Sequence, residues 1–228
     1  MNRYEFWLAS NSPRRRELLG WADWRVNLVS SDVDESMLEF ELAENYVKRL
    51  AVIKLTELKD IPDFDFVLAA DTIVVLDDEI LGKPTSEEHA ISILCDLRGR
   101  THVVMTALAV RQGGQTDPIV ELCKSEVKMR NYSDTEIYHY VDSGDSMDKA
   151  GAYAIQNPDL HPVVDFKGCV ASVMGMPLCH LERSLRKYRF YEETEWPRIC
   201  QMKLKYTCPI TGQVMAGDDL ADGKLEIE

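Results

Sequence analysis

Nine of the eleven residues from 66 to 76, with the sequence FVLAADTIVVL, are apolar. A short continuous apolar run rich in β-branched residues predicts a strand that is buried on both faces. Asp71 stands in the middle of this run, where a carboxylate without a partner would be costly. Two alternatives remain open at this point. Either Asp71 has a cation, a metal or a catalytic task, or Asp71 and Thr72 form a turn that ends the strand.

The apolar segment at residues 6–9 predicts a short strand that leads into a helix starting near Pro13. Ser12 suits the N-cap of this helix, and Pro13 suits its first position. The basic run Arg14–Arg16 then places cations in the first turn, where they oppose the helix dipole. Because a bound anion would remove that penalty, we favour a phosphate site here over a solvated basic turn.

The remaining pattern predicts alternating strands and helices along the chain. Further strands are expected at residues 26–29, 79–81, 101–111, 119–129, 163–166 and 169–173. Further helices are expected at about residues 39–58, 86–97, 134–141 and 177–188. Thr85–Glu88 has the spacing of a capping box, and Ser133–Glu136 that of a helix cap.

Two loops between these elements carry side chains of interest. The acidic loop at 30–36 offers carboxylates to a metal ion, although on its own evidence a solvated loop is the favoured interpretation. The segment at 148–156 has neither helical nor alternating periodicity, and its small residues flank polar ones, as where a backbone approaches a ligand. A plain connecting loop is the competing interpretation of that segment.

Composition limits the class of partner. The 228 residues are 45% hydrophobic and 29% charged, which suits a folded chain of one domain or two small lobes. With 26 Lys and Arg against 39 Asp and Glu, the formal net charge is −13. This charge argues against a general nucleic-acid-binding protein. An anionic ligand would therefore need a local cluster of cations.

The cysteines favour a reducing compartment. There are six of them, scattered and without a C-x-x-C pair, as expected for reduced thiols. A zinc site at Cys200 and Cys208 is disfavoured by the spacing and by the absence of a nearby His. The apolar segment near the N-terminus is too short for a signal peptide, and no run approaches the ~20 apolar residues that span a bilayer. We expect a cytoplasmic protein that does not bind membranes.

Several charged residues fall at the ends of predicted elements, a distribution that suits phosphoanhydride hydrolysis. In such a site cations and a metal ion take up phosphate charge while a carboxylate activates water. The candidates are Arg14, Arg15, Lys54, Lys83 and Lys149 among the bases, and Asp34, Glu35 and Asp71 among the acids. For Lys54 a surface position is the default interpretation. The chain contains neither the P-loop motif nor G-x-G-x-x-G, which disfavours P-loop and dinucleotide-binding enzymes.

Five motifs, in matching order, resemble those of the Maf family. They are LASNSPRRRELL at 8–19, ADTIV at 70–74, LGKP at 81–84, DKAGAY at 148–153 and VMGMP at 173–177. The resemblance covers about residues 4–190. It implies a nucleoside triphosphate pyrophosphatase, and an α/β fold with a mixed sheet and two lobes around a central cleft, resembling the inosine triphosphate pyrophosphatases. It also implies a tendency to form a homodimer.

The resemblance assigns roles to individual residues. Asp71 matches the proton acceptor, and the bases Arg14, Lys54 and Lys83 match phosphate-binding positions. Glu35, next to Asp34, matches an acidic metal-site position, so that Glu35 and Asp71 are expected to hold Mg²⁺ or Mn²⁺. Ser10 belongs to the first motif and is expected to contact substrate. The branch of the family that acts on dTTP and UTP is marked by the residues that correspond to Arg15, Thr72 and Gln156.

The resemblance has limits. Ala154 and Asn157 replace glycines that flank the Ile-Gln pair in the family, which we expect to stiffen that loop. Residues 191–228 lie outside the resemblance and are expected to form a partly irregular extension of unknown role with an acidic cluster at 218–222. Two alternative functions remain: a housecleaning pyrophosphatase for modified pyrimidine nucleotides, and a regulatory binding protein in cell division and septum formation.

Overall fold

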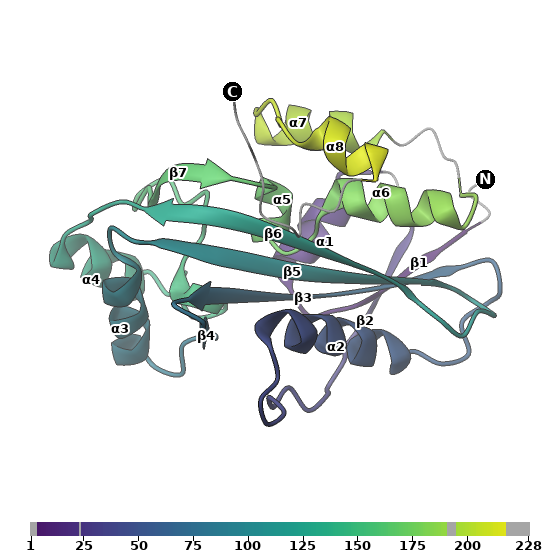
Figure 1. The fold of residues 1–228 in the computed structure, drawn as a ribbon, viewed down its shortest axis with the longest axis horizontal. Coiled ribbons are helices and arrows are strands. Elements are labelled where there is room, and N and C mark those ends of the chain that lie inside the picture. The colour runs from purple at the N-terminus through teal and green to yellow at the C-terminus, as the bar shows by residue number, and fades with distance from the viewer. Residues whose placement is uncertain (1–3, 23, 191–194, 218–228) are drawn as a thin grey trace.

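The computed structural model describes residues 4–22, 24–190 and 195–217. Within these residues seven strands form one mixed sheet, in which β4 pairs with β3 beside the main order β2-β1-β3-β5-β6-β7 (Figure 1). The strands are β1 (Phe6–Ala9), β2 (Val26–Val29), β3 (Phe66–Leu76), β4 (Glu79–Leu81), β5 (Thr101–Gln112), β6 (Ile119–Met129) and β7 (Val163–Lys167). The expected α/β class with a mixed sheet is confirmed.

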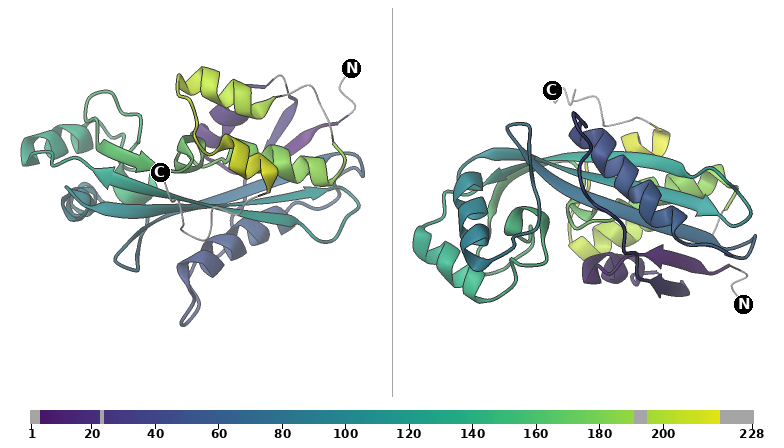
Figure 2. Two further views of the ribbon diagram at one scale, coloured as in Figure 1. Left: turned by 45° about the horizontal axis from the view of Figure 1, so that its top comes forward. Right: turned by 90° about the horizontal axis from the view of Figure 1, so that it is seen from below.

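Helices cover both faces of the sheet. They are α1 (Pro13–Leu19), α2 (Ala43–Thr56), α3 (Glu87–Leu97), α4 (Asp134–Asp142), the 3₁₀ turn η1 (Ala150–Ala152), α5 (Val170–Val173), α6 (Leu178–Lys187), α7 (Trp196–Leu204) and α8 (Thr211–Ala216). Helix α2 lies on the opposite side of the sheet from α6, α7 and α8, whereas α3 and α4 sit at one end of the long strands (Figures 1 and 2). No helix in these described ranges is long and apolar enough to cross a membrane.

The two faces of β3 belong to different hydrophobic cores, because side chains alternate along a strand. Ala69 and Ile73 pack with the buried residues of α2. Leu68 and Ala70 pack instead in the core that includes α1, α5 and α6. A third cluster joins α3 and α4 to the far ends of β5 and β6. The prediction of a strand buried on both faces is therefore confirmed.

One edge of β3 is incompletely paired. Strand β5 pairs with β3 from Phe66 to Val75 along one edge. On the other edge β1 pairs with Phe66–Leu68 and β4 with Val74–Leu76. Residues 69–73 therefore have no strand partner on that side, and Asp71 and Thr72 lie in this gap. The alternative in which these two residues form a turn is wrong, because β3 continues through them.

The structure corrects the predicted strand at 169–173. Residues Val170–Val173 form helix α5 instead, with Cys169 at its N-cap, where the Cys169 sulfur accepts a hydrogen bond from the Ser172 N–H. Gly168, at φ +132°, changes the direction of the chain directly after β7. A short apolar run has no period that separates a strand from a single helical turn, so the sequence pattern was ambiguous here.

Two predicted helix starts also shift. Helix α2 begins at Ala43 rather than near residue 39, because the Glu41 N–H bonds back to the Leu38 carbonyl in a turn that holds Phe40 at φ +57°. The cap of α3 is Ser86 rather than Thr85, since the Ser86 hydroxyl accepts the His89 N–H. By contrast, Ser133 and Glu136 form a complete capping box on α4.

The C-terminal extension is more regular than expected where it is described. Helices α7 and α8 pack on α6 (Figure 1). The Trp196 ring is 1% exposed and meets the Trp24 ring edge to face at 4.9 Å between centroids. The acidic cluster expected at 218–222 lies outside the described residues. Up to residue 217 the extension thus adds side chains to one of the main cores.

Candidate functional site

A pocket of about 380 Å³ opens at the unpaired edge of β3, a volume in the range of small-molecule sites. The nine residues that the family resemblance predicts to bind substrate or metal all line this pocket. They are Ser10, Arg14, Arg15, Glu35, Lys54, Asp71, Thr72, Lys83 and Gln156. The residues come from the carboxyl end of β1, the start of α1, the loop before α2, α2 itself, β3, the segment after β4 and the loop after η1. Tertiary folding thus joins segments that are distant along the chain.

Asp71 has a cation for a partner. The Lys54 ammonium donates to Asp71 Oδ1 at 2.6 Å, and its Nζ lies equally close, at 2.6 Å, to Glu35 Oε1. The side chains of Lys54 and Asp71 are both 10% exposed, whereas that of Glu35 is 55% exposed. Helix α2 brings Lys54 to the pocket because its apolar stripe packs on the β3 face that Asp71 shares. The expectation that a buried carboxylate needs a cation is confirmed, and the default interpretation of Lys54 as a surface residue is wrong.

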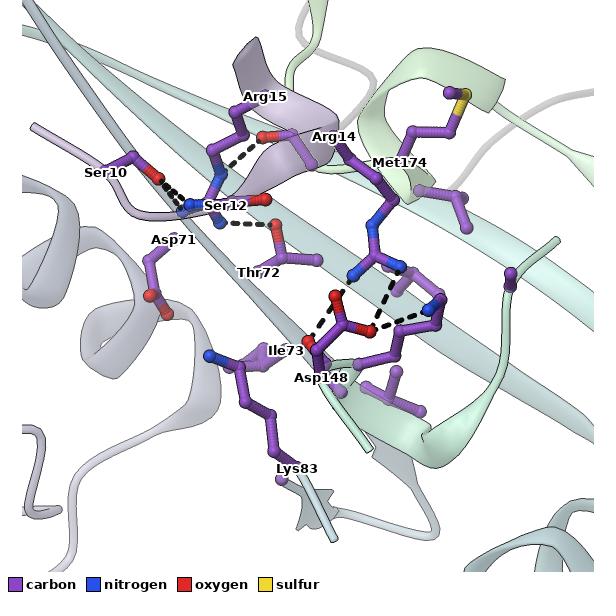
Figure 3. Close-up of a pocket in the computed structure, with 18 of the residues that line it drawn as sticks. Ser10, Ser12, Arg14, Arg15, Asp71, Thr72, Ile73, Lys83, Asp148 and Met174 are labelled. Atoms are coloured by element: carbon purple, nitrogen blue, oxygen red, sulfur yellow. Dashed lines mark hydrogen bonds and ion pairs between the residues drawn. The ribbon is translucent and has the colours of Figure 1, made fainter. Parts of the chain in front are cut away.

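Arg15 lies on the other side of the gap. Its guanidinium donates to the Gly175 carbonyl at 3.0 Å, to Ser10 Oγ at 3.2 Å and to Thr72 Oγ1 at 3.1 Å (Figure 3). All three acceptors are neutral, and burial lowers the pKa of Arg15, an effect that Asp71 partly opposes. Gly175, at φ +108°, leaves room for this arrangement, since a Cβ there would lie 3.3 Å from Arg15 Nε. The Arg15 side chain is therefore held in place before any ligand arrives.

Arg14 and Lys149 share an acidic loop on the far wall. Arg14 Nη1 lies 3.9 Å from Asp148 Oδ1. The buried Lys149 ammonium contacts carboxylate oxygens of Asp145 at 2.7 Å and Asp148 at 2.6 Å. Lys149 is thus already neutralised by carboxylates, whereas the weaker pairing of Arg14 leaves it freer to meet an anionic ligand.

Lys83 and Gln156 are two exposed members of the set. Lys83 extends from the segment after β4, and its ammonium points across the pocket toward Asp71 (Figure 3). Gln156 sits in a turn that Asn157 stabilises, because Asn157 Oδ1 accepts the Leu160 N–H at 2.8 Å and its Nδ2 donates to Asp145 at 3.2 Å. The substitution of this glycine thus adds side-chain hydrogen bonds to the loop, while Gln156 still lines the pocket.

The pocket is positively charged within an acidic protein. Five cations and three carboxylates line it, for a formal charge of +2, against −13 for the whole chain. Such a concentration of cations attracts and orients a polyanion. The carboxylate of Asp71, held among them, can accept a proton from a water molecule.

Glu35 and Asp71 are the residues that fit a divalent cation. Their carboxylates lie close together, on either side of Lys54, whose Nζ is 2.6 Å from an oxygen of each. In the described part of the chain no group of three His, Cys, Asp or Glu side chains could hold a metal ion by itself. Mg²⁺ is commonly held by one or two carboxylates together with substrate phosphates, so these two residues suit a metal that arrives with a phosphorylated ligand.

Some residues of the pocket escaped the sequence analysis. Tyr46 lines the pocket, and its hydroxyl donates to the Glu35 carbonyl at 2.7 Å. Asp148 was noticed only as part of a motif, although it pairs with Arg14. Asp34, by contrast, does not line the pocket and accepts the Ser36 N–H at 2.9 Å. The signal that could have revealed Tyr46 is its helical spacing from Lys54, since residues eight apart lie on one face of α2.

Comparisons with known proteins cover the same segments. The family model described as Maf-like protein matches residues 5–188. The chain is 40% identical over 183 residues to a dTTP/UTP pyrophosphatase of Photorhabdus laumondii, across 80% of this chain and 93% of that protein. It is 43% identical over 180 residues to a dTTP/UTP pyrophosphatase of Shewanella denitrificans, across 75% of this chain and 89% of that one. A solved HAM1 protein from Coxiella burnetii aligns with 57% of this chain and 74% of its own at 15% identity and a TM-score of 0.38.

Proposed function

The chain belongs to the Maf family, and we propose that it is a pyrophosphatase that hydrolyses dTTP and UTP to the nucleoside monophosphate and pyrophosphate. The observation that carries the proposal is the pocket itself. It places Asp71, paired with Lys54, beside further cations in one hollow, in a chain about 40% identical to proteins with that activity. A pocket that only bound nucleotides would gain nothing from a buried carboxylate beside the phosphates.

The residues suggest how the reaction proceeds. Asp71 accepts a proton from a water molecule, whose oxygen forms a bond to the α-phosphorus as the bond to the oxygen bridging to the β-phosphorus breaks. The leaving pyrophosphate takes the electron pair of that bond. Lys83 and Arg14 are cations that line the same pocket and would hold the charge of the pyrophosphate. Lys54 holds the Asp71 carboxylate in position from α2.

We propose that Glu35 and Asp71 hold Mg²⁺ or Mn²⁺ together with the substrate phosphates. A divalent cation bound there would reduce the negative charge of the triphosphate. Chelation with EDTA should therefore stop pyrophosphate release, and added Mg²⁺ should restore it.

A nucleotide panel with pyrophosphate detection tests the function. The purified full chain should release pyrophosphate from dTTP and UTP faster than from the purine triphosphates. Asp71→Asn should lower kcat by at least about a hundredfold, because the amide cannot take up the proton. Asp34→Asn, a change at an exposed carboxylate outside the pocket, is the matched control and should keep wild-type activity. Absence of pyrophosphate release from every nucleotide, or full activity of the Asp71 variant, would contradict the proposal.

Assembly and location remain predictions. We propose a cytoplasmic homodimer, supported by two features of the described residues. All six cysteines are free, as suits a reducing compartment. The turn before α2 exposes several large apolar side chains, with Phe40 93% exposed, which is unusual for a surface that stays in water. Light scattering of the purified protein would measure the assembly state.

A further inference from the structure

Thr106 contacts Thr72 from within the sheet and does not itself line the pocket. The two residues are cross-strand partners on β5 and β3. Thr106 is fully buried, and its Oγ1 lies 3.0 Å from Thr72 Oγ1 and 2.8 Å from the Ser172 carbonyl oxygen of α5. Thr72 itself lines the pocket. Thr106 can therefore act on a ligand only through the residues it contacts, of which Thr72 lines the pocket.

The direction of each hydrogen bond in this chain follows from counting protons. A carbonyl oxygen has no proton, so the Thr106 hydroxyl must donate to Ser172 at 2.8 Å. That leaves no Thr106 proton for Thr72, and two hydroxyl oxygens 3.0 Å apart without a proton between them would repel. The Thr72 hydroxyl therefore donates inward to Thr106. Its oxygen also accepts an N–H of Arg15, so one lone pair is left for the pocket.

The Ser10 hydroxyl has the opposite role to that of Thr72, because it can donate a hydrogen bond to a ligand. Its Oγ accepts the Ser12 N–H at 3.1 Å and an Arg15 N–H at 3.2 Å. With both lone pairs engaged, the proton of the Ser10 hydroxyl is available to a ligand. Arg15 also has N–H groups beyond the three that its contacts use. The wall near Arg15 thus presents donors beside the hydroxyl acceptor of Thr72.

We propose that Thr106 is a positioning residue that makes Thr72 an obligatory hydrogen-bond acceptor and thereby selects uracil and thymine over cytosine. This inference rests on the proposed function. Uracil and thymine carry an N3–H donor flanked by carbonyl acceptors, which complements the Thr72 acceptor flanked by donors. Cytosine carries an unprotonated N3, whose lone pair would face that of Thr72. A site that leaves polar groups unpaired rejects the wrong ligand strongly.

Substitution of Thr106 separates this role from a structural one. Thr106→Val keeps the shape but removes the hydroxyl, so that the Thr72 proton can turn toward the pocket. We expect the ratio of kcat/KM for UTP to that for CTP to fall by about tenfold. Thr106→Ser restores the hydroxyl and should restore the ratio. A loss of packing alone would lower kcat/KM for both nucleotides equally and leave the ratio unchanged.

A second measurement and a control complete the test. Ser125→Ala removes another buried hydroxyl, outside the pocket, which accepts the Cys169 N–H, and it should keep the wild-type ratio. Binding of UMP and CMP to the full chain, measured by calorimetry, does not depend on turnover or on the Thr106 variants folding. Wild-type protein should prefer UMP. The proposed function fails if wild-type protein releases no pyrophosphate from UTP or dTTP. The inference fails if wild-type protein does not prefer UMP, if Thr106→Val keeps the ratio, or if Thr106→Ser loses it as fully as Thr106→Val.

Discussion

Lys54 shows at the scale of one residue how the pocket manages its charge. Its ammonium stands between Asp71 and Glu35, at 2.6 Å from an oxygen of each. A buried carboxylate is tolerated when a cation desolvates with it, and loss of one partner leaves the other unpaired. The Lys54–Asp71 ion pair therefore stabilises the buried carboxylate and also orients it.

Lys54→Met tests whether the charge of Lys54, rather than the volume of its side chain, holds Asp71 in position. The methionine keeps the unbranched side chain but removes the charge, so that Asp71 and Glu35 repel each other and Asp71 loses its orientation. We expect kcat/KM for UTP to fall by about a hundredfold, as measured by pyrophosphate release. Lys48→Met, on the same helix but outside the pocket, should change it little. Equal activity of the two variants would show that Lys54 does not position Asp71.

At the scale of an element, helix α4 shows how a local capping box sets the start of a helix. The Ser133 hydroxyl accepts the Glu136 N–H at 3.3 Å, and a Glu136 carboxylate oxygen accepts the Ser133 N–H at 2.7 Å. Arg130 donates to the same carboxylate and, as the largest cause, lowers the pKa of Glu136 to about 2. The cap thus joins α4 to the end of β6, far from the substrate pocket.

Ser133→Ala should weaken this helix start without touching the pocket. Loss of a serine N-cap lowers the free energy of unfolding by about 1 kcal/mol. Urea denaturation followed by circular dichroism would measure it. Because Ser133 lies outside the pocket, kcat/KM for UTP should stay at the wild-type value. A Ser133→Asp variant, which retains a capping acceptor, should lose less stability than the alanine variant, and the reverse order would contradict the capping role.

At the scale of the whole molecule, the extension contributes to the core. A carboxylate oxygen of Glu182 in α6 accepts a hydrogen bond from the backbone N–H of Trp196, at the start of α7, at 3.0 Å. Arg183 contacts the Val214 carbonyl in α8 at 3.1 Å and also pairs with Glu121 of β6. These contacts attach α7 and α8 to the face of the sheet opposite α2.

Trp196→Ala should therefore destabilise the whole protein. Removal of a fully buried aromatic ring costs about 3–5 kcal/mol, which should appear as a lower urea midpoint in one transition shared with the pocket. Met202→Ala, on the same helix but 63% exposed, is the control and should shift the midpoint little. A separate early transition for α7 and α8, with the main transition unchanged, would show that the extension folds on its own.

Acid should destabilise the molecule through His102. This ring is 2% exposed, lies 2.8 Å from the Tyr153 hydroxyl, and burial lowers its pKa from 6.5 to about 4. Between these values the unfolded chain binds the proton and the folded chain does not. Stability is therefore lost as the pH falls from 6.5 toward 4, by up to about 3 kcal/mol.

Denaturation at pH 7 and pH 5 would measure this loss. His102→Asn should reduce the difference between the two pH values, although it also lowers stability at pH 7. His139→Asn, at an exposed site of α4, should leave the difference at its wild-type size. An unchanged difference in the His102 variant would assign the acid sensitivity to other groups.

Much of the pocket could be predicted because many of its charged side chains belong to short, recognisable sequence segments. The basic turn at Arg14 and Arg15, the lone acid at Asp71 and the lysine at Lys83 are each visible in a few residues. The pairing of Thr72 with Thr106 was not visible, because it depends on the register of two strands joined through a hairpin and a helix. Lys54 could be assigned a role only by resemblance, since nothing local distinguishes a lysine on the buried end of a helix from one on its surface.

The sequence by itself determined the elements whose signals are local: the central strand, the Ser133 cap, and the family to which the motifs belong. Tertiary structure alone decided that β1 and β4 leave residues 69–73 of β3 without a strand partner, and that Lys54 and Glu35 meet Asp71 there. The physical reason is distance along the chain. Propensity and capping act over a few residues, whereas a pocket needs side chains from distant segments to be held together by the packing of a common core.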